Sequence, residues 1–161
     1  MDRLWSPWRA KYTASGVDAQ RDRCVFCEIG RDPGHDDENF VLFRGERCFV
    51  VLNLFPYITG HLMVIPYDHV GDLASTDKPT TDEMMDLIKR SETALQNAYQ
   101  PSGFNVGMNL GASAGAGIAD HIHAHLLPRW GGDTNFMTTV AETRVLPEDL
   151  QTTHQRLRQT F

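Results

Sequence analysis

Apolar residues along the chain are grouped in short runs of extended character and in one longer stretch with helical spacing. Residues 48–53 and 61–66 are β-rich runs, and a turn through Pro56 and Gly60 separates them. Two such runs joined by a proline and glycine turn predict an antiparallel pair of strands. Two further strands are predicted at residues 104–110 and 121–127, on either side of a loop of small residues.

The helical stretch follows Thr81 and Asp82, which predict its N-cap. Apolar residues then recur every three to four positions until Pro101 and Gly103, which is the spacing of an amphipathic helix covering one face of a sheet. A last helix is predicted from Pro147 to about residue 157, because proline is tolerated in a first helical turn. Strands, then a helix, then strands predict an α+β domain with an antiparallel sheet.

The length of 161 residues predicts a single domain, since about 100 to 200 residues form one hydrophobic core. Glycine and proline interrupt any period in the first 40 residues. We divide the chain into an N-terminal arm (1–23), a core (24–135) and a C-terminal segment (136–161). Trp5 and Trp8 lie in the arm, where packing on a partner subunit and packing on the core are equally compatible with the sequence.

Charge narrows the class of partner. Fifteen Lys and Arg against 21 Asp and Glu give a net charge of −6, which argues against a general binder of nucleic acid or anionic membranes, because phosphate-rich surfaces are held by an excess of basic residues. A small-molecule partner is expected instead. No apolar run approaches the roughly 18 residues of a membrane span, and the N-terminus has no apolar segment for secretion, so we expect a cytoplasmic protein.

The strongest chemical signal is the row His121-Ile-His123-Ala-His125. On a strand, alternate residues share a face, so the three imidazoles are predicted to stand on one side at intervals of roughly 6.6 Å. Such a row suits metal binding through imidazole nitrogen. It also suits catalysis in which a neutral imidazole attacks phosphorus and a second one handles the proton of the leaving group. A metal-dependent hydrolase with all three histidines as ligands is therefore one alternative.

A second signal is Cys24-Val-Phe-Cys27, two thiols at the spacing of half a tetrahedral zinc site. Two ordinary buried thiols are the alternative interpretation. Cys48 lies in an apolar run and is predicted to be a core thiol. His35 and His154 have no comparable context and are predicted to lie on the surface.

Gly60-His61 at the start of a strand, the stretch from residue 105 to 117 and His121-Ile-His123-Ala-His125-Leu-Leu-Pro128 occur in an order that resembles the histidine triad (HIT) family of nucleotide hydrolases and transferases. The resemblance covers roughly residues 24–135. Leu4-Trp-Ser-Pro-Trp-Arg9 and residues 128–136 are further similar to a bacterial, zinc-containing branch that includes diadenosine tetraphosphate phosphorylases. The resemblance to the family implies the HIT-like fold, which is an antiparallel sheet of about five strands with one long helix and a C-terminal helix.

The resemblance also implies a catalytic set. His123 takes the place of the family's nucleophile, which attacks an α-phosphate to form a nucleotidyl-histidine intermediate that water or phosphate then releases. His125 takes the position that contacts the phosphate and assists the leaving group, and His61 that of the upstream histidine completing the site. An unprotonated His123 with a proton-donating helper predicts a bell-shaped dependence of activity on pH.

Positions that bind the nucleotide are implied in the same way. Asn53 matches a polar residue near the ribose, and Asn109 matches one beside the phosphates. Gly115 and Gly117 belong to the glycine-rich loop, and Trp130 is assigned to the nucleotide pocket or to the subunit boundary.

Zinc-containing relatives complete the cysteine pair with a histidine soon after the Gly-His strand and with the first histidine of the triad, here His69 and His121. The resemblance therefore implies a closed structural zinc site of Cys24, Cys27, His69 and His121, with no open position for water. HIT proteins are commonly homodimers, and a homodimer is expected here.

The acceptor and the alternative function stay open at the level of sequence. Ala116-Gly117 departs from the Gly-Gln pattern of the human-type hydrolases, so hydrolysis and phosphorolysis are both possible. A zinc-containing module that binds a nucleotide or a protein without catalysis is the alternative, although it leaves His61, His123 and His125 without a role. The expected partner is a small nucleotide, with neither nucleic acid nor a membrane.

Overall fold

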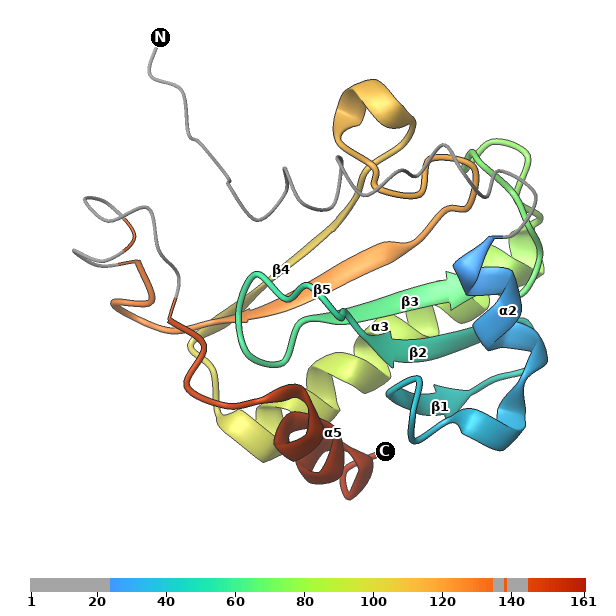
Figure 1. Cartoon of the computed structure of the whole chain (residues 1–161). Coiled ribbons are helices and arrows are strands. Elements are labelled where there is room, and N and C mark those ends of the chain that lie inside the picture. The colour runs from blue at the N-terminus through green and yellow to red at the C-terminus, as the bar shows by residue number, and fades with distance from the viewer. Residues whose placement is uncertain (1–23, 135–137, 139–144) are drawn as a thin grey trace, which may run out of the picture.

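The computed structural model describes residues 24–134, 138 and 145–161, which form one antiparallel sheet with helices on both of its faces (Figure 1). The strands are Val41–Arg44 (β1), Cys48–Leu52 (β2), Leu62–Pro66 (β3), Gly103–Met108 (β4) and Ala124–Arg129 (β5), in the spatial order β1-β2-β3-β5-β4. The helices are Val25–Arg31 (α2), Lys78–Tyr99 (α3) and Leu150–Arg158 (α5), with short 3-10 turns at Pro33–His35 (η2) and Ala112–Ala114 (η3). The predicted α+β class with an antiparallel sheet is confirmed.

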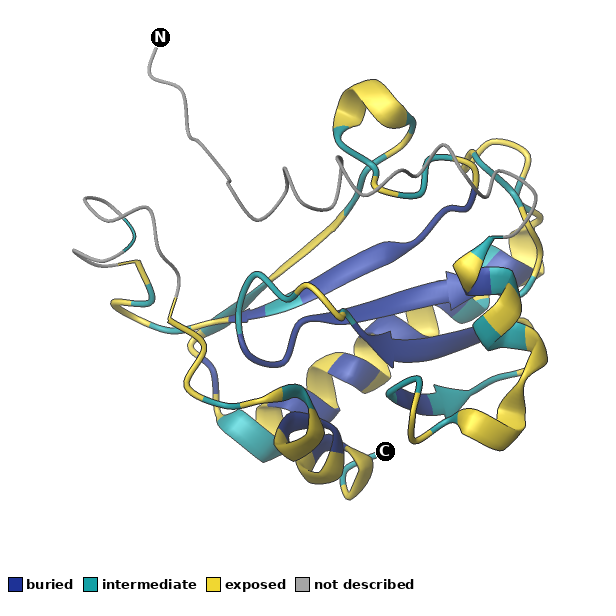
Figure 2. Ribbon diagram, viewed as in Figure 1, coloured by how far each residue is buried: buried dark blue, intermediate teal, exposed yellow. Residues whose placement is uncertain are grey.

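Side chains of the central strands alternate between two apolar layers. Val50, Leu62 and Leu126 belong to the layer that also contains the buried face of α3, whereas Val51 belongs to the layer that contains Phe26 of α2. Because both faces are covered, β2 and β3 are buried along their whole length and show continuous apolar runs in the sequence. The edge strand β4 is mostly exposed (Figure 2).

The predicted start of the histidine strand is wrong. β5 begins at Ala124 rather than at residue 121, because β3 and β4 pair only with residues from Ala124 onward. His121 and His123 therefore lie in the approach to the strand, and only His125 lies within it.

The predicted start of the long helix is also wrong. α3 begins at Lys78, where the Asp77 carboxylate accepts a hydrogen bond from the Thr80 amide at 2.9 Å. Pro79 lies in the first turn, where its missing N–H costs no intrahelical hydrogen bond. The helix thus starts before its apolar spacing becomes visible in the sequence.

Neither α2 nor β1 is predicted from the sequence, because both are short and lie close to interrupting glycine and proline residues. Arg44 joins them. Its guanidinium donates to the carbonyl oxygens of Ile29 at 2.7 Å and Gly30 at 2.9 Å, and to the carboxylate of Asp36 at 2.7 Å. One side chain therefore fixes the C-terminal end of α2 against the edge of the sheet.

The prediction that His154 lies on the surface is wrong. Its ring is 2% exposed, packs edge-on against Phe40 and donates from Nε2 to the carbonyl oxygen of Val41 at 3.0 Å. It joins α5 to β1, a contact that only the tertiary fold reveals. His35 is exposed and Cys48 is buried, as predicted.

Trp5, Trp8 and the rest of the predicted N-terminal arm lie outside the described residues, as do residues 136, 137 and 139–144 of the predicted C-terminal segment. Within the described part of the chain, no helix combines the length and the apolar character needed to cross a bilayer.

Candidate active site and metal centre

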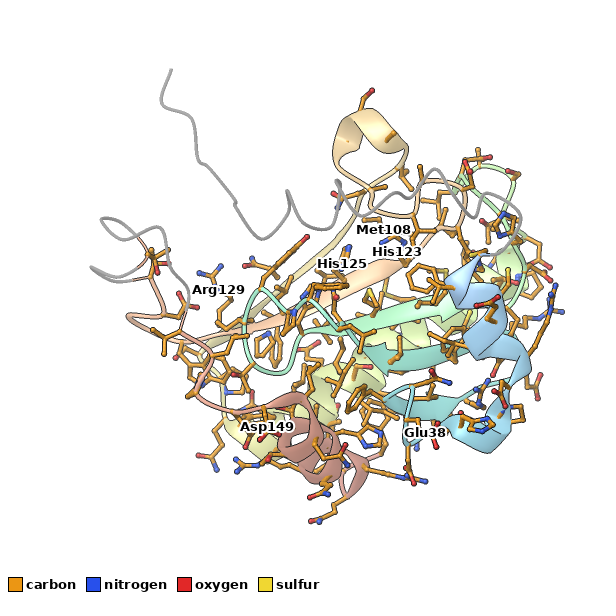
Figure 3. The ribbon with its side chains drawn as sticks, in the orientation of Figure 1. Glu38, Met108, His123, His125, Arg129 and Asp149 are labelled. Atoms are coloured by element: carbon orange, nitrogen blue, oxygen red, sulfur yellow. The ribbon has the colours of Figure 1, made fainter. Side chains whose placement is uncertain are left out.

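Three histidines, His61, His123 and His125, meet on the face of the sheet that α2 covers, and Figure 3 labels the last two. His125 stands on β5 beside Met63 of β3, and His61 directly precedes β3. Gly60 has a positive φ of 78°, and a Cβ at this position would lie 2.9 Å from the Leu95 side chain, so glycine is required for the turn into His61. His61 Nε2 and His125 Nδ1 are 2.9 Å apart.

The hydrogen bonds assign the proton of each imidazole to one nitrogen. The backbone amide of Tyr57 donates to His61 Nδ1 at 3.2 Å, so neutral His61 carries its proton on Nε2 and donates it to His125 Nδ1. Neutral His125 consequently carries its proton on Nε2. His123 Nδ1 donates to the carbonyl oxygen of His121 at 2.9 Å, which leaves an unprotonated Nε2 on His123. The arrangement combines one nucleophilic nitrogen with one neighbouring N–H donor.

Burial favours the uncharged forms of His61 and His123. Desolvation, together with the neighbouring His125 and His123, lowers the pKa of His61 to about 3. Desolvation also lowers the pKa of His123, although the hydrogen bond to the His121 carbonyl opposes the shift. A neutral His123 can attack an electrophile near pH 7 without first losing a proton.

His123 and His125 line a cavity of about 520 Å³, a volume in the range of small-molecule sites. Four further residues assigned to the substrate from the sequence also line it: Asn53, Asn109, Gly115 and Gly117. Much of the remaining wall is apolar and includes Val25, Phe26, Ile29, Val51, Leu54, Met63 and Ile118. The cavity therefore has a polar end at the histidines and an apolar part under α2.

No Asp, Glu, Lys or Arg is among the described residues that line this cavity. Hydrogen-bond donors must therefore hold any anionic ligand. The loop around η3 turns back at Gly111 and Gly115, both with positive φ, and the amides of Ala114 and Gly115 are used within the loop. The amides of Ala116 and Gly117, which line the cavity, are the candidate donors to phosphate oxygens.

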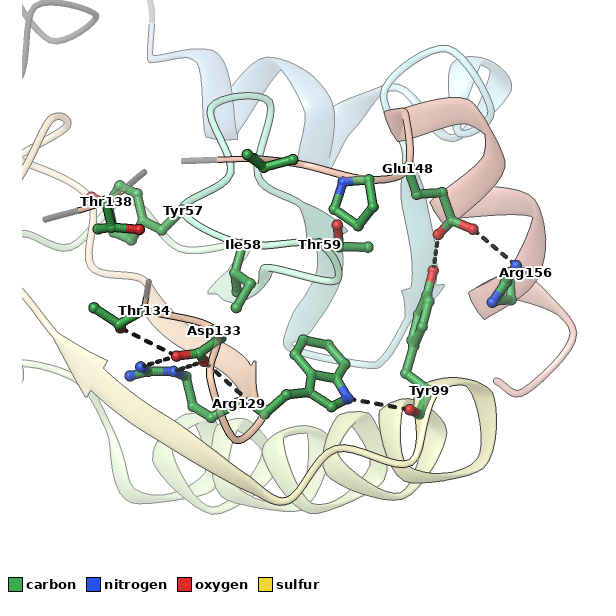
Figure 4. A pocket seen from close by; sticks show the side chains of 13 residues that line it. Tyr57, Ile58, Thr59, Tyr99, Arg129, Asp133, Thr134, Thr138, Glu148 and Arg156 are labelled. Carbon is green, nitrogen blue, oxygen red and sulfur yellow. Dashed lines mark hydrogen bonds and ion pairs between the residues drawn. The ribbon is translucent and has the colours of Figure 1, made fainter. Parts of the chain in front are cut away.

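The structure separates Trp130 from these residues. Trp130 lines a second cavity of about 460 Å³, where its indole Nε1 donates to the carbonyl oxygen of Tyr99 at 3.4 Å (Figure 4). Arg129 and Asp133 form an ion pair in the same wall, with 2.6 Å between Nε and the carboxylate. Tyr57 lines both cavities, so the two adjoin at this residue.

The sulfur and nitrogen ligands predicted for zinc come together as a second cluster. In Cys24, Cys27, His69 and His121, one ligand atom from each residue lies within 4.8 Å of all the others. His121 Nδ1 is 3.3 Å from Cys24 Sγ and 3.6 Å from Cys27 Sγ, and His69 Nδ1 is 3.3 Å from Cys27 Sγ. Tetrahedral zinc with the usual bond lengths places sulfur and nitrogen about 3.5 Å apart. The donor set and its spacing therefore fit one zinc ion.

The orientation of His121 supports the same fit. Its Nε2 donates to the carbonyl oxygen of Pro66 at 2.8 Å, so its Nδ1 lone pair is available to the cluster. α2 carries Cys27 into this cluster and Val25, Phe26 and Ile29 into the wall of the larger cavity.

Sequence reasoning missed two contributors to the site. The Phe26 ring contacts both clusters, with centroid distances of 5.5 Å to His121 of the Cys/His cluster and 5.1 Å to His123 of the histidine cluster. Its position inside the Cys24–Cys27 spacing is the signal that would have found it. Tyr57 acts through its backbone amide, for which the sequence carries no signal.

Comparisons with known proteins agree with this geometry. The family model described as HIT domain matches residues 35–132. The chain is 40% identical to AP-4-A phosphorylase of Mycobacterium tuberculosis (strain H37Rv), in an alignment covering 98% of this chain and 83% of the relative. A Zn-bound histidine triad family protein from Mycobacterium smegmatis has a TM-score of 0.69 and 29% identity, covering 85% of this chain and 91% of that structure. A hypothetical histidine triad nucleotide-binding protein from Sulfolobus tokodaii has a TM-score of 0.68 and 25% identity, covering 85% of this chain and 91% of that structure.

The buried neutral state of His61 predicts that stability depends on pH. The unfolded chain protonates this histidine near pH 6.5 and the folded chain only near pH 3, so unfolding takes up a proton between these values. Below pH 6.5 the free energy of unfolding is expected to lose up to about 1.4 kcal/mol per pH unit from this group. Urea titrations at several pH values measure the free energy of unfolding as a function of pH. Below pH 6.5 this free energy should fall less steeply with decreasing pH in His61→Gln than in the unaltered protein.

The exposed His35 provides the control, because His35→Gln should not make the slope shallower. Equal slopes for His61→Gln and the unaltered protein would contradict the assignment of His61 as a buried neutral group.

Proposed function

The chain belongs to the HIT family of nucleotide hydrolases and transferases, and on that premise we propose that it cleaves dinucleoside polyphosphates at an α-phosphate through a covalent intermediate on His123. The observation that carries the proposal is the hydrogen bond from His123 Nδ1 to the His121 carbonyl, which leaves Nε2 as a nucleophile on a residue that lines the cavity. The name of the M. tuberculosis relative supports diadenosine tetraphosphate as the substrate.

In the first step, His123 Nε2 forms a bond to the α-phosphorus, and the bond from that phosphorus to its bridging oxygen breaks. ATP leaves as an anion, while AMP stays on His123. His125 donates a hydrogen bond from Nε2–H to the departing oxygen without transferring the proton. Its Nδ1 already accepts a hydrogen bond from His61 Nε2–H. This network makes His125 a neutral hydrogen-bond donor, so it does not require the bell-shaped pH profile expected from the sequence.

In the second step, an acceptor attacks the same phosphorus and the bond to His123 breaks, which restores the neutral imidazole. Inorganic phosphate attacks as an oxyanion and gives ADP, whereas water must lose a proton and gives AMP. His61 and His125 both present N–H groups here, and His123 is bonded to phosphorus, so these histidines supply no base for water. We therefore favour phosphate as the acceptor.

Incubation with diadenosine tetraphosphate, with and without inorganic phosphate, tests the acceptor and the nucleophile. With phosphate we expect ADP and ATP, whereas hydrolysis would give AMP and ATP. His123→Ala should lower kcat by about 10⁴-fold or more, because the covalent route is lost, and it should form no AMP adduct in intact mass spectra at neutral pH. His35→Ala is the matched control. Comparable turnover in His123→Ala would overturn the mechanism.

We propose that Cys24, Cys27, His69 and His121 hold a structural zinc ion. All four protein ligands are present, so the site is closed, and zinc there would tie α2 to the approach of β5.

Because thiols persist unoxidised in a reducing compartment, we also place the protein in the cytoplasm, which cell fractionation checks.

Loss of zinc should lower stability without removing the reacting groups. Cys27→Ser is expected to reduce zinc, measured by elemental mass spectrometry, from about one ion per chain to a small fraction of that amount, and to lower the melting temperature, because binding energy of a structural zinc is also folding energy. Cys48→Ala, away from the cluster, should keep its zinc. Full zinc content in Cys27→Ser, or a melting temperature unaffected by a strong chelator, would contradict the site.

We propose that the chain forms a homodimer through β4. β4 is an edge strand with Val106 53% exposed, and an uncovered apolar edge favours pairing with a second strand. Sedimentation velocity should show about twice the mass of one chain, and Val106→Lys should shift the distribution toward monomers. The same substitution at the exposed Met85 of α3 is the control, and a monomeric unaltered protein would overturn the proposal.

A further inference from the structure

Asn39 is a polar residue in the wall of the cavity that contains His123 and His125. Within the described part of the chain, no residue forms a side-chain hydrogen bond with its carboxamide. The neighbouring Asn53 differs, because its Oδ1 already accepts the Phe55 amide at 2.9 Å. Asn39 therefore offers both a donor and an acceptor to a ligand.

The backbone on both sides of Asn39 is held in place. Its amide donates to the carbonyl oxygen of His35 at 2.9 Å, and the carbonyl oxygen of Phe40 accepts the Leu52 amide at 3.1 Å. Phe40 has a positive φ of 57°, a conformation that costs free energy and persists only where the surroundings determine it. The position of Asn39 is thus set before any ligand binds.

The order of the strands places Asn39 at the far side of the cavity from the reacting groups. Val41, Val51, Met63 and His125 are paired in turn across β1, β2, β3 and β5. Three strand spacings, about 14 Å, therefore separate β1 from β5. Since Asn39 directly precedes β1, it lies about this far across the sheet from His125.

A nucleotide has its phosphate, sugar and base in that order, and the cavity runs from His123 to Asn39, so a nucleotide with its α-phosphate at His123 has room for its base on the β1 side. Asn53, at the end of β2, lies between the two ends of this path. The apolar side chains of Val25 and Ile29 in the same cavity suit the faces of a base. Asn39 is the polar residue at the β1 side that can reach the edge of that base.

We infer that Asn39 hydrogen-bonds the adenine base at its N6 amino group and N7, and that it makes the site select adenine over guanine. A carboxamide presents one donor beside one acceptor, which matches adenine at N6 and N7. Guanine presents two acceptors, O6 and N7, at the same edge, so Asn39 Oδ1 would face an acceptor. The inference rests on the proposed function and adds base selectivity to it.

Calorimetric titration with AMP and with GMP tests Asn39 without requiring turnover. Asn39→Leu should weaken AMP binding by about 10-fold or more, the effect of losing one bidentate contact to a base, and should change GMP binding by less than about 2-fold. Asn39→Asp keeps the shape and the acceptor but lacks the donor, so it should also lose the preference for AMP. Asn97→Leu, on an exposed position of α3, is the matched control. Melting temperatures verify that each variant is folded.

Equal changes for AMP and GMP, or no change, would overturn the inference, as would failure of the unaltered protein to bind AMP. Titration with 2′-deoxy-AMP separates the base from the sugar: if Asn39→Leu no longer matters for this ligand, Asn39 contacts the ribose and the base assignment is wrong. Failure of the catalytic proposal would look different, because AMP would bind in an Asn39-dependent way while diadenosine tetraphosphate stayed intact.

Discussion

The chemistry of this protein depends on the anchoring of its imidazoles by the backbone. His61 accepts from the Tyr57 amide, and His123 donates to the His121 carbonyl. Each of these hydrogen bonds fixes whether one ring nitrogen carries the proton, and thereby decides whether the other nitrogen of the same ring is a donor or an acceptor. Without them, the tautomers would exchange, and the same histidines would present a donor or a lone pair at random. The approach to β5 keeps the carbonyl of His121 within reach of the His123 ring, so in the proposed mechanism this backbone geometry fixes which nitrogen of His123 attacks.

α2 is the element through which the two histidine clusters are related. It places Cys27 against His69 and His121, and it brings Phe26 against the rings of both His121 and His123. Arg44 holds the other end of this seven-residue helix on the sheet. A helix of this length is only marginally stable by itself. The proposed zinc site at one end and Arg44 at the other would therefore both support the wall that α2 gives to the larger cavity.

The α+β class and the long helix could be predicted from the apolar runs and the helical spacing, because burial on one or both faces of an element sets these patterns, whereas the HIT-like fold is implied by the resemblance to the family. The Cys24-Val-Phe-Cys27 spacing predicts half of the Cys₂His₂ cluster, and the resemblance to zinc-containing relatives implies its two histidines. The start of β5 could not, because strand pairing ends where β3 and β4 stop offering partners. The burial of His154 and the placement of Trp130 in a second cavity could not be predicted for a related reason: both depend on contacts between segments far apart in the chain.

The net charge of −6 and a polyphosphate substrate are compatible because the larger cavity contains no charged side chain among its described lining residues. Neutral donors hold an anion by directed hydrogen bonds, whose strength rises as water is excluded, whereas a cationic surface attracts any polyanion over long distances. Neutrality serves the nucleophile as well. A nearby cation would favour the unprotonated state of His123 but would also weaken its lone pair as a nucleophile, while burial lowers its pKa without adding charge. Under the proposed function, the same desolvation would prepare His123 as the nucleophile, and the lack of charge would favour a small phosphate ester over an extended polyanion.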